Sequence, residues 1–354
     1  MNILVALSGG VDSAVCAHIL KSQGFNITGA MMKIYNGSII SSALNSCYGS
    51  DKAAEINDAK KICAQLECDF HLIDVSQEFN KLVFENFKSQ YLNAKTPNPC
   101  VLCNPLIKFG VFPKKALELG IKFDKFATGH YVRNIFDHDS GKYKLMRAKN
   151  HKKDQSYFLY ALTQEKLSKI LFPLGDMLKE EVRQYALENN IPVANKRDSQ
   201  DFYDGSYSDL LNVDAKCGDI VDKFGNVLGR HKGLHNYTIG QRKGLLIAYS
   251  EPLYVIGFDT KNNRLIVSTK NDTYAQGLYA KNINWILDVP QKPFEAQIKI
   301  RSAQQPAECI IHPIQQDCVK VLFKTPQSAV APGQAAVFYN EDTVLGGGTI
   351  DSQI

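Results

Sequence analysis

A glycine-rich segment near the N-terminus carries the residue types best suited to hold phosphate. It reads Ser-Gly-Gly-Val-Asp-Ser over residues 8–13 and directly follows the apolar run 3–7. Glycines let the backbone approach phosphate oxygens and adopt positive φ. Serine hydroxyls and the free N–H groups of a helix start donate hydrogen bonds to anions. The spacing therefore predicts a strand, a phosphate-binding turn and a helix.

Asp12 is the unusual member of this segment, because phosphate repels a carboxylate. A cation between the two groups would remove the repulsion, and Mg²⁺ prefers carboxylate oxygens as ligands. We therefore expect Asp12 to bind Mg²⁺, directly or through water. No lysine follows the glycines, which excludes the phosphate loop of phosphoryl-transfer enzymes. The segment instead resembles the pyrophosphate loop of ATP pyrophosphatases, which implies cleavage of ATP between its α- and β-phosphates.

Cys100 and Cys103 form a second candidate site, on a segment stiffened by Pro97 and Pro99. A C-x-x-C pair on a loop can bind a metal or cluster, form a redox disulfide or present a nucleophilic thiolate. Two thiols are too few for a closed zinc site. A helix predicted to begin near Pro105 would favour the thiolate form of Cys103 through its N-terminus.

Two further segments carry polar groups that suit a nucleotide or nucleic-acid site. Residues 127–131, Ala-Thr-Gly-His-Tyr, end a predicted strand and should face the same ligand as residues 8–13. Residues 153–159 combine a cation, an amide and aromatic rings, which suits contact with a phosphate and a base.

Composition narrows the class of protein. The chain has 354 residues, of which 44% are apolar and 22% charged, which is typical of a soluble globular protein with two or three domains. The net charge of +5 permits nucleic-acid binding but is weak evidence for it. No stretch reaches the ~18 apolar residues of a membrane span, and no signal peptide is evident. We therefore expect a cytoplasmic protein whose nine cysteines are reduced.

Periodicity predicts two kinds of architecture. Strands at 3–7, 26–33, 70–75 and 123–127 alternate with helices at 11–23, 53–66, 79–92 and 106–119, and two more helices follow within 162–190. This alternation predicts an α/β domain with a doubly wound parallel sheet, whose ligands bind at the carboxyl ends of the strands. After residue 205, a hairpin at 218–230 and short β-rich runs predict a small central domain and an antiparallel β-barrel. The expected boundaries are 1–204, 205–270 and 271–354.

These motifs together resemble the bacterial tRNA-specific 2-thiouridylases over nearly the whole chain. The resemblance rests on residues 8–13, 96–109, 127–131 and 153–159, and it continues through 172–175, 198–200, 218–222 and 237–244. It implies an ATP pyrophosphatase domain, a central domain and a barrel that together grip the anticodon stem-loop of tRNA. In this reaction the 2-oxygen of the wobble uracil attacks the α-phosphate of ATP, pyrophosphate leaves, and sulfur then displaces AMP.

The resemblance also assigns roles to individual residues. Cys103 matches the catalytic nucleophile. The ATP-binding residues would be Ala6, Leu7, Ser8, Gly9, Gly10, Val11, Asp12, Ser13, Met32 and Gly129. The tRNA-binding residues would be Asn98, Pro99, Cys100, Lys153, Asp154, Gln155, Arg301 and Ser302, of which Asn98, Pro99 and Cys100 would meet the target base.

The chain departs from the family pattern at its sulfur chemistry. Many members carry a second catalytic cysteine soon after the pair equivalent to Ser199-Gln200, and this chain has none there. It has Cys100 where many members have aspartate. In one solution, Cys47, Cys100 and Cys103 hold a 4Fe–4S cluster whose open iron carries sulfide. In the other, Cys100 and Cys103 form a redox pair that receives sulfur from a donor or relay protein.

The other cysteines are expected to serve the packing of the fold rather than the chemistry. Cys63 is a reserve cluster ligand, although its helical spacing suits a core position. Packing is expected for Cys16, Cys68, Cys217, Cys309 and Cys318.

Two other functions stay open from the sequence. An ATP-dependent ligase that adenylates a small carboxylate or amide would explain residues 8–13 but not the cysteine pair or the barrel. A tRNA-binding protein without sulfur-transfer activity would explain the missing cysteine, but Asp12 and Cys103 are intact.

Overall fold

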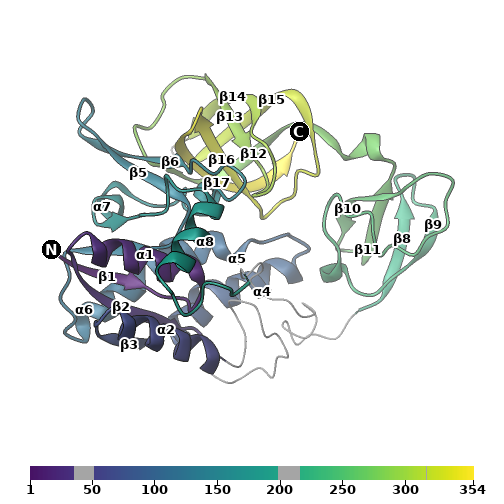
Figure 1. Ribbon diagram of the computed structural model, residues 1–354. Coiled ribbons are helices and arrows are strands. Elements are labelled where there is room, and N and C mark those ends of the chain that lie inside the picture. Colours follow the sequence, from purple (N-terminus) through teal and green to yellow (C-terminus); the bar gives the residue numbers. More distant parts are fainter. Residues whose placement is uncertain (36–51, 198–215, 316) are drawn as a thin grey trace. The chain divides into compact units, whose positions relative to one another are not determined.

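The computed structural model describes residues 1–35, 52–197, 216–315 and 317–354 (Figure 1). It contains two compact units, which are described separately. The first comprises Met1–Val83, Cys100–Gly205 and Asp342–Val344, and the second comprises Phe84–Pro99, Ser206–Glu341 and Leu345–Ile354. Within the described ranges, none of the helices combines the length and apolar character needed to cross a membrane.

A five-stranded parallel sheet forms the centre of the first unit. Its order is β3-β2-β1-β4-β7, and every neighbouring pair is parallel. The strands are β1 (Asn2–Ala6), β2 (Asn26–Lys33), β3 (Phe70–Asp74), β4 (Lys125–Thr128) and β7 (Ile170–Leu171). The predicted parallel sheet is therefore confirmed, with β7 as a short addition that the sequence analysis did not locate.

Helices cover both faces of this sheet. Helices α1 (Val11–Ser22), α2 (Ala53–Gln65) and α8 (Lys179–Glu188) share a core with the strand residues Ile3 and Val5. On the other face, the Phe126 ring of β4 packs edge-on against Phe109 and Phe112, where helix α6 (Phe112–Glu118) begins. Alternate strand residues point to opposite faces, so continuous apolar strands fit this two-sided cover.

The order in which strands are added to the sheet reverses beside β1. The chain proceeds from β1 to β2 on one side and returns to β4 on the other side. Loops that leave β1 and β4 therefore diverge at the carboxyl edge, and ligands bind at such switch points. The segments that follow Ala6 and Thr128 both begin at this edge.

Helix boundaries near the cysteine pair differ from the prediction. Cys100 and Cys103 lie in helix α5 (Pro99–Cys103) rather than on a loop, and the chain continues through a π-helical stretch, Asn104–Val111, into α6. A helix that begins at Pro99 has its proline at the first position, where the missing N–H costs nothing. The expectation that a helix begins near Pro105, with its N-terminus at Cys103, is therefore wrong.

Other helical and strand segments were merged or missed in the prediction. The helix predicted at 79–92 consists of α3 (Ser76–Phe79), a π-helical turn Asn80–Phe84 and α4 (Glu85–Leu92). The two helices predicted within 162–190 are the short helix α7 (Gln164–Leu167) and α8, whereas the hairpin of β5 (Val132–Asp137) and β6 (Lys142–Arg147) was not foreseen. Their polar, half-exposed faces carry little hydrophobic periodicity.

The second unit contains a four-stranded sheet with the order β10-β11-β8-β9. Strands β8 (Gly218–Asp222) and β9 (Val227–His231) form the predicted hairpin, and β10 (Tyr254–Asp259) and β11 (Arg264–Ser268) match the predicted runs. At the hairpin turn, the Asp222 carboxylate accepts hydrogen bonds from the N–H groups of Phe224 and Asn226, each at 2.9 Å. Ile220, Val255 and Leu265 are fully buried in a small core.

Six further strands form the predicted antiparallel barrel. Their order is β12-β15-β14-β13-β16-β17, and a pairing of β12 with β17 closes the barrel. They span Tyr274–Trp285 (β12), Phe294–Lys299 (β13), Ala307–Gln315 (β14), Cys318–Ser328 (β15), Ala335–Asn340 (β16) and Thr343–Gln353 (β17). The β12–β17 pairing joins the two outer strands of these six, the sheet continues from β17 to β6 and β5, and the inward side chains of the barrel form a separate apolar core.

The structure separates the cysteines expected to pack by their burial. Cys16, Cys63 and Cys309 are buried, Cys68 and Cys318 are partly buried, and Cys217 is exposed, so packing is wrong for Cys217. Cys63 lies in the core, as its helical spacing indicated, and its thiol hydrogen-bonds with that of Cys68.

Thiol labelling tests this distribution. Burial raises the pKa of Cys16, and it raises the pKa of Cys309 to about 12. Because only the thiolate reacts, we expect iodoacetamide at pH 8 to modify Cys217 in the native protein while sparing Cys16 and Cys309. All three should react in denaturant, and peptide mass spectrometry measures the extents. Equal native labelling of the three thiols would contradict the fold.

Candidate active site

Residues 8–13 form a compact loop between β1 and α1. The Ser13 hydroxyl donates to the Gly10 carbonyl at 3.0 Å and accepts from the Ser8 N–H at 3.1 Å. Helix α1 begins at Val11, so its first N–H groups have no partner within the helix. Ser13 thus closes the loop, while Ser8 is exposed and its hydroxyl lies 3.2 Å from that of Ser13. The arrangement is a turn suited to an anion.

Two glycines allow the backbone segments around this loop to approach one another. Gly9 has φ of 71°, and a Cβ there would lie 2.6 Å from the Glu55 carbonyl oxygen of α2. A Cβ at Gly129, just after β4, would lie 2.7 Å from the carbonyl carbon of Asp12. Side chains at either position would collide with main chain, so both glycines are sterically required. Gly129 therefore lies against the loop, at the edge where the sequence predicted it.

The Asp12 carboxylate is held by two groups from distant parts of the first unit. Its Oδ1 accepts a hydrogen bond from Lys179 Nζ at 2.7 Å and another from the Tyr131 hydroxyl at 2.8 Å. The Lys179 ammonium also lies 5.8 Å from the centre of the Tyr131 ring, within reach of a cation–π interaction. A protein ammonium group therefore lies beside Asp12, the residue at which the sequence analysis expected Mg²⁺.

A second lysine contacts the same loop at Gly9. Lys196 Nζ donates to the Gly9 carbonyl at 3.1 Å and to the Asp58 carboxylate of α2 at 2.9 Å. Its side chain is 35% exposed, in contrast to 8% for Lys179. Two ammonium groups from outside the loop therefore contact residues 9 and 12.

His130 lies at the carboxyl end of β4 in a largely apolar setting. Its Nδ1 is 2.7 Å from the Thr128 hydroxyl, and its Nε2 is 3.5 Å from Lys108 Nζ. The rings of Phe109 and Phe172 flank it. Burial, with a contribution from the Lys108 charge, lowers the pKa of His130 well below its usual value. The imidazole is therefore neutral at pH 7 and accepts or donates one hydrogen bond at each nitrogen.

The cysteine pair is partly exposed on helix α5. Cys100 and Cys103 are both half-buried, and Asn104 Nδ2 donates to the Cys100 carbonyl at 3.0 Å. Cys47 and the stretch after Ser199-Gln200 lie outside the described residues. Elsewhere, in the ranges that the structure describes, no group of three His, Cys, Asp or Glu side chains could hold a metal.

Asp154 anchors the loop that follows β6. Its side chain is 0% exposed and accepts hydrogen bonds from the Ala148 N–H at 3.1 Å and the Ser156 hydroxyl at 2.8 Å. Gln155 Oε1 accepts from the Tyr131 N–H at 2.9 Å, whereas Lys153 is exposed. Lys153, Asp154 and Gln155 were all expected to contact tRNA. Of these three residues, Asp154 has its carboxylate engaged in hydrogen bonds within the loop.

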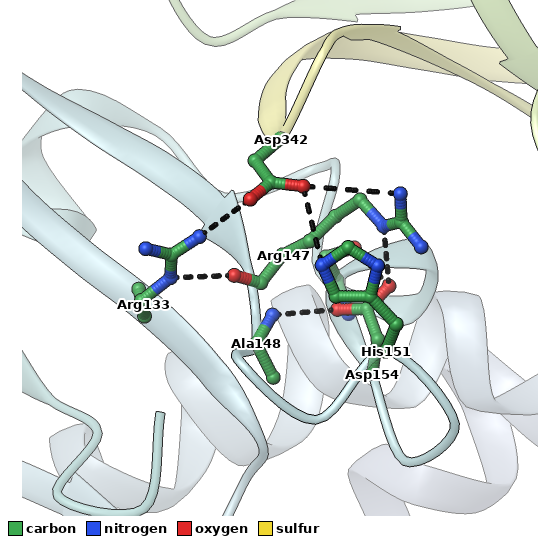
Figure 2. A network of polar contacts seen from close by, with 7 residues as sticks. Arg133, Arg147, Ala148, His151, Asp154 and Asp342 are labelled. Carbon is green, nitrogen blue, oxygen red and sulfur yellow. Dashed lines mark hydrogen bonds and ion pairs between the residues drawn. The ribbon is translucent and has the colours of Figure 1, made fainter. Parts of the chain in front are cut away.

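Figure 2 shows the ion network around this loop. Asp342 accepts a hydrogen bond from Arg133 at 2.8 Å, and it lies 3.8 Å from Arg147 and 3.4 Å from His151. Arg147 in turn lies 3.7 Å from Asp154. The network ties the loop to the β5–β6 hairpin through alternating charges.

The remaining predicted residues lie at separate positions. Met32 is half-buried near the end of β2, opposite Ile73 of β3. Asn98 and Pro99 belong to the second unit, as does Arg301, which donates to the Ile239 carbonyl at 3.4 Å. Ser302, next in the chain, is half-buried.

The sequence analysis missed Lys179, Lys196 and the hydroxyl role of Tyr131. One feature could have drawn attention to Lys179. It is the first residue of α8, where the helix dipole disfavours a cation. A helix that begins with a buried lysine must gain from a specific anion nearby.

Models of three protein families match successive stretches of the chain. Residues 1–203 match a family model described as a tRNA methyl transferase HUP domain. Residues 211–269 match a tRNA methyl transferase PRC-barrel domain, and residues 275–350 match an aminomethyltransferase beta-barrel domain.

Full-length relatives carry a consistent name. A tRNA-specific 2-thiouridylase of Endomicrobium trichonymphae is 47% identical over 99% of both chains. One from Pelobacter propionicus is 44% identical over 100% of this chain and 98% of its own. Another from Geotalea uraniireducens is 42% identical over 100% of this chain and 96% of its own.

Substitution of Asp154 tests its role as the anchor of the loop. Asp154→Ala removes the buried acceptor of the Ala148 N–H and the Ser156 hydroxyl, so we expect a loss of about 1–3 kcal/mol in the free energy of unfolding. The exposed Lys152→Ala is the matched control and should change it by less than about 0.5 kcal/mol. Urea denaturation measures both. Equal effects of the two substitutions would refute an anchoring role.

Proposed function

Because the chain belongs to the tRNA-specific 2-thiouridylase family, we propose that it replaces the 2-oxygen of a tRNA uridine with sulfur, at the expense of ATP. The observation that carries this proposal is the full-length relationship combined with an intact loop at residues 8–13. That loop is closed by Ser13 and neutralised at Asp12 by Lys179. These features support nucleotide binding and adenylation at the carboxyl edge of the parallel sheet.

The proposed reaction balances in two displacements. The uracil 2-oxygen attacks the α-phosphorus of ATP, a P–O bond forms, and pyrophosphate leaves with the electron pair of the broken P–O bond. Sulfur then adds to C2, and the C2–O bond breaks as AMP departs with the former uracil oxygen. Adenylation thereby converts a poor oxygen leaving group into a good one.

We propose the wobble uridine as the target, because an anticodon loop presents its bases unpaired and available for extrusion. Ala6 to Ser13, Met32 and Gly129 would bind ATP. Asn98, Pro99 and Cys100 would meet the base. Lys153, Gln155, Arg301 and Ser302 would contact tRNA, while Asp154 would act by shaping the loop that presents its neighbours.

Mg²⁺ is proposed to accompany ATP. Both contacts to Asp12 fall on Oδ1, so Oδ2 is the oxygen with which Asp12 would meet the ion, directly or through water. When bound, Mg²⁺ would neutralise charge on the departing pyrophosphate. Asp12 fits this role as one ligand in a site completed by phosphate oxygens.

Cys103 is the residue that we propose to handle sulfur. Two routes differ in which other thiols act together with it. Cys100 and Cys103 provide two thiols, so a 4Fe–4S cluster would also need Cys47, which the structure does not describe. The other route uses Cys100 and Cys103 as a redox pair loaded by a sulfur donor or relay protein. The iron content of the purified protein decides between the two routes, since Cys47→Ala would abolish bound iron only in the cluster route.

A tRNA substrate also favours a cytoplasmic location.

A thiolation assay tests the function. The protein, purified without oxygen, is incubated with unmodified tRNA, ATP, Mg²⁺ and sulfide, and the digested nucleosides are weighed. We expect 2-thiouridine from the unaltered chain and from the control Cys217→Ser, whose thiol is exposed in the second unit. Cys103→Ser should yield AMP-linked tRNA but less than about 1% of the thiolated product, because it lacks the sulfur-handling thiol.

Two results would count against this account. Full thiolation by Cys103→Ser would remove that residue as nucleophile or cluster ligand. Cleavage of ATP to AMP by the unaltered chain without thiouridine, at any sulfide concentration, would point to a different adenylated substrate.

A further inference from the structure

The C-terminal end of α2 brings two cysteines together, away from the proposed active site. Leu66 is the C-terminal cap of this helix. Beyond it, the Cys68 N–H donates to the Cys63 carbonyl at 3.0 Å, and the Glu67 N–H donates to the Ala64 carbonyl at 3.2 Å. These two bonds, with Glu67 at a φ of 47°, form a Schellman motif. Cys63 and Cys68 hold the two positions of the motif whose side chains commonly touch.

The two sulfur atoms make this contact. The thiols of Cys63 and Cys68 hydrogen-bond with each other, and the Gly29 backbone hydrogen-bonds with both. A Cβ at Gly29 of β2 would lie 2.4 Å from Cys63 Sγ, so the glycine leaves the space that this sulfur occupies. An S–S bond requires two cysteines whose side chains are close and face each other. The helix cap therefore holds this pair in an arrangement suited to a disulfide.

The two thiols differ in protonation and in access. Cys63 is 2% exposed, and its hydrogen bond with Cys68 and its burial both raise the pKa of the Cys63 thiol. Cys68 is partly exposed. The same hydrogen bond, with smaller contributions from the Gly29 backbone and the Lys21 charge, lowers the pKa of the Cys68 thiol and outweighs the opposing effect of its burial. Because the thiolate is the reactive form, Cys68 is the nucleophile of the pair.

We propose that Cys63 and Cys68 form a reversible disulfide when the protein meets hydrogen peroxide. In the first step, the Cys68 thiolate attacks one peroxide oxygen, the O–O bond breaks, and the hydroxide that leaves takes up a proton to become water. Cys68 is then a sulfenic acid. In the second step, the Cys63 sulfur attacks Cys68, the S–O bond breaks, and hydroxide leaves with the Cys63 proton as water. The two sulfurs lose two electrons, and the peroxide gains them.

This disulfide site is separate from the proposed sulfur chemistry at Cys103. Cys68 lies just before the amino end of β3, which begins at Phe70, whereas residues 8–13 follow the carboxyl end of β1. Strands β1, β2 and β3 are parallel, so these ends lie at opposite edges of the sheet. The disulfide would therefore modify the cap of α2 independently of the proposed reaction on tRNA.

Peptide mass spectrometry tests the disulfide. Trypsin releases both cysteines on one peptide, residues 62–81, because no lysine or arginine lies between Lys61 and Lys81. The reduced native protein is treated with hydrogen peroxide, quenched with catalase and unfolded in iodoacetamide. We expect this peptide to lose two hydrogen atoms and to carry no label, at a rate at least about tenfold above the oxidation of the exposed Cys217. Reduction with dithiothreitol before labelling should restore both labels.

Two serine variants separate the roles of the sulfurs. Cys63→Ser keeps the accessible thiol, so dimedone, which traps sulfenic acids, should label Cys68 after peroxide treatment. Cys68→Ser keeps only the buried thiol, which should give neither a disulfide nor a dimedone adduct. Cys217→Ser is the matched control, and its peptide 62–81 should oxidise as it does in the unaltered chain.

Peptide 62–81 of the unaltered chain gives the decisive result, even where a serine variant fails to fold. Retention of both labels until Cys217 is fully oxidised would overturn the proposal. A sulfenic acid that persists on Cys68 without a disulfide would also overturn it, because the two sulfurs would then not meet. A disulfide that joins Cys68 to any cysteine other than Cys63 would do the same.

Discussion

The carboxylate of Asp12 joins three segments that are far apart in the sequence. It belongs to the first turn of α1, accepts from the Tyr131 hydroxyl after β4, and pairs with Lys179 at the start of α8. Removing it would take this counter-charge away from the buried ammonium of Lys179, which is costly in a protein interior. The same carboxylate also sets the charge of the phosphate loop, so the folding of the site and its ligand chemistry depend on one group.

Close backbone approach is the second constraint on this edge of the sheet. Gly9 brings the loop against α2, and Gly129 brings β4 against Asp12, in each case at a distance that a Cβ would violate. The strand order then determines what lies there, because loops leaving β1 and β4 diverge at the carboxyl edge. Rigid strands thus hold the loop in position, and side chains from later segments complete it.

Local signals explain which parts could be predicted from the sequence. The loop at residues 8–13 was identified because its strand, glycines and helix start are contiguous in the sequence. The hairpin around Gly225 was identified because its two strands and turn are likewise contiguous. Lys179 and Lys196 were missed because they lie 167 and 187 residues from their loop partners. The C-x-x-C pair was misplaced on a loop because Pro99 reads as a helix breaker, although it suits a first helical position.

The central claim is that the uracil 2-oxygen is adenylated before sulfur replaces it. An anticodon stem-loop labelled with ¹⁸O at the 2-position of the target uridine tests this claim directly, with AMP weighed by mass spectrometry after a single turnover with ATP and sulfide. The account predicts that AMP carries the label in proportion to the thiouridine formed. Unlabelled AMP alongside full conversion to thiouridine would contradict it, because the oxygen would then have left by a route that does not pass through the α-phosphate.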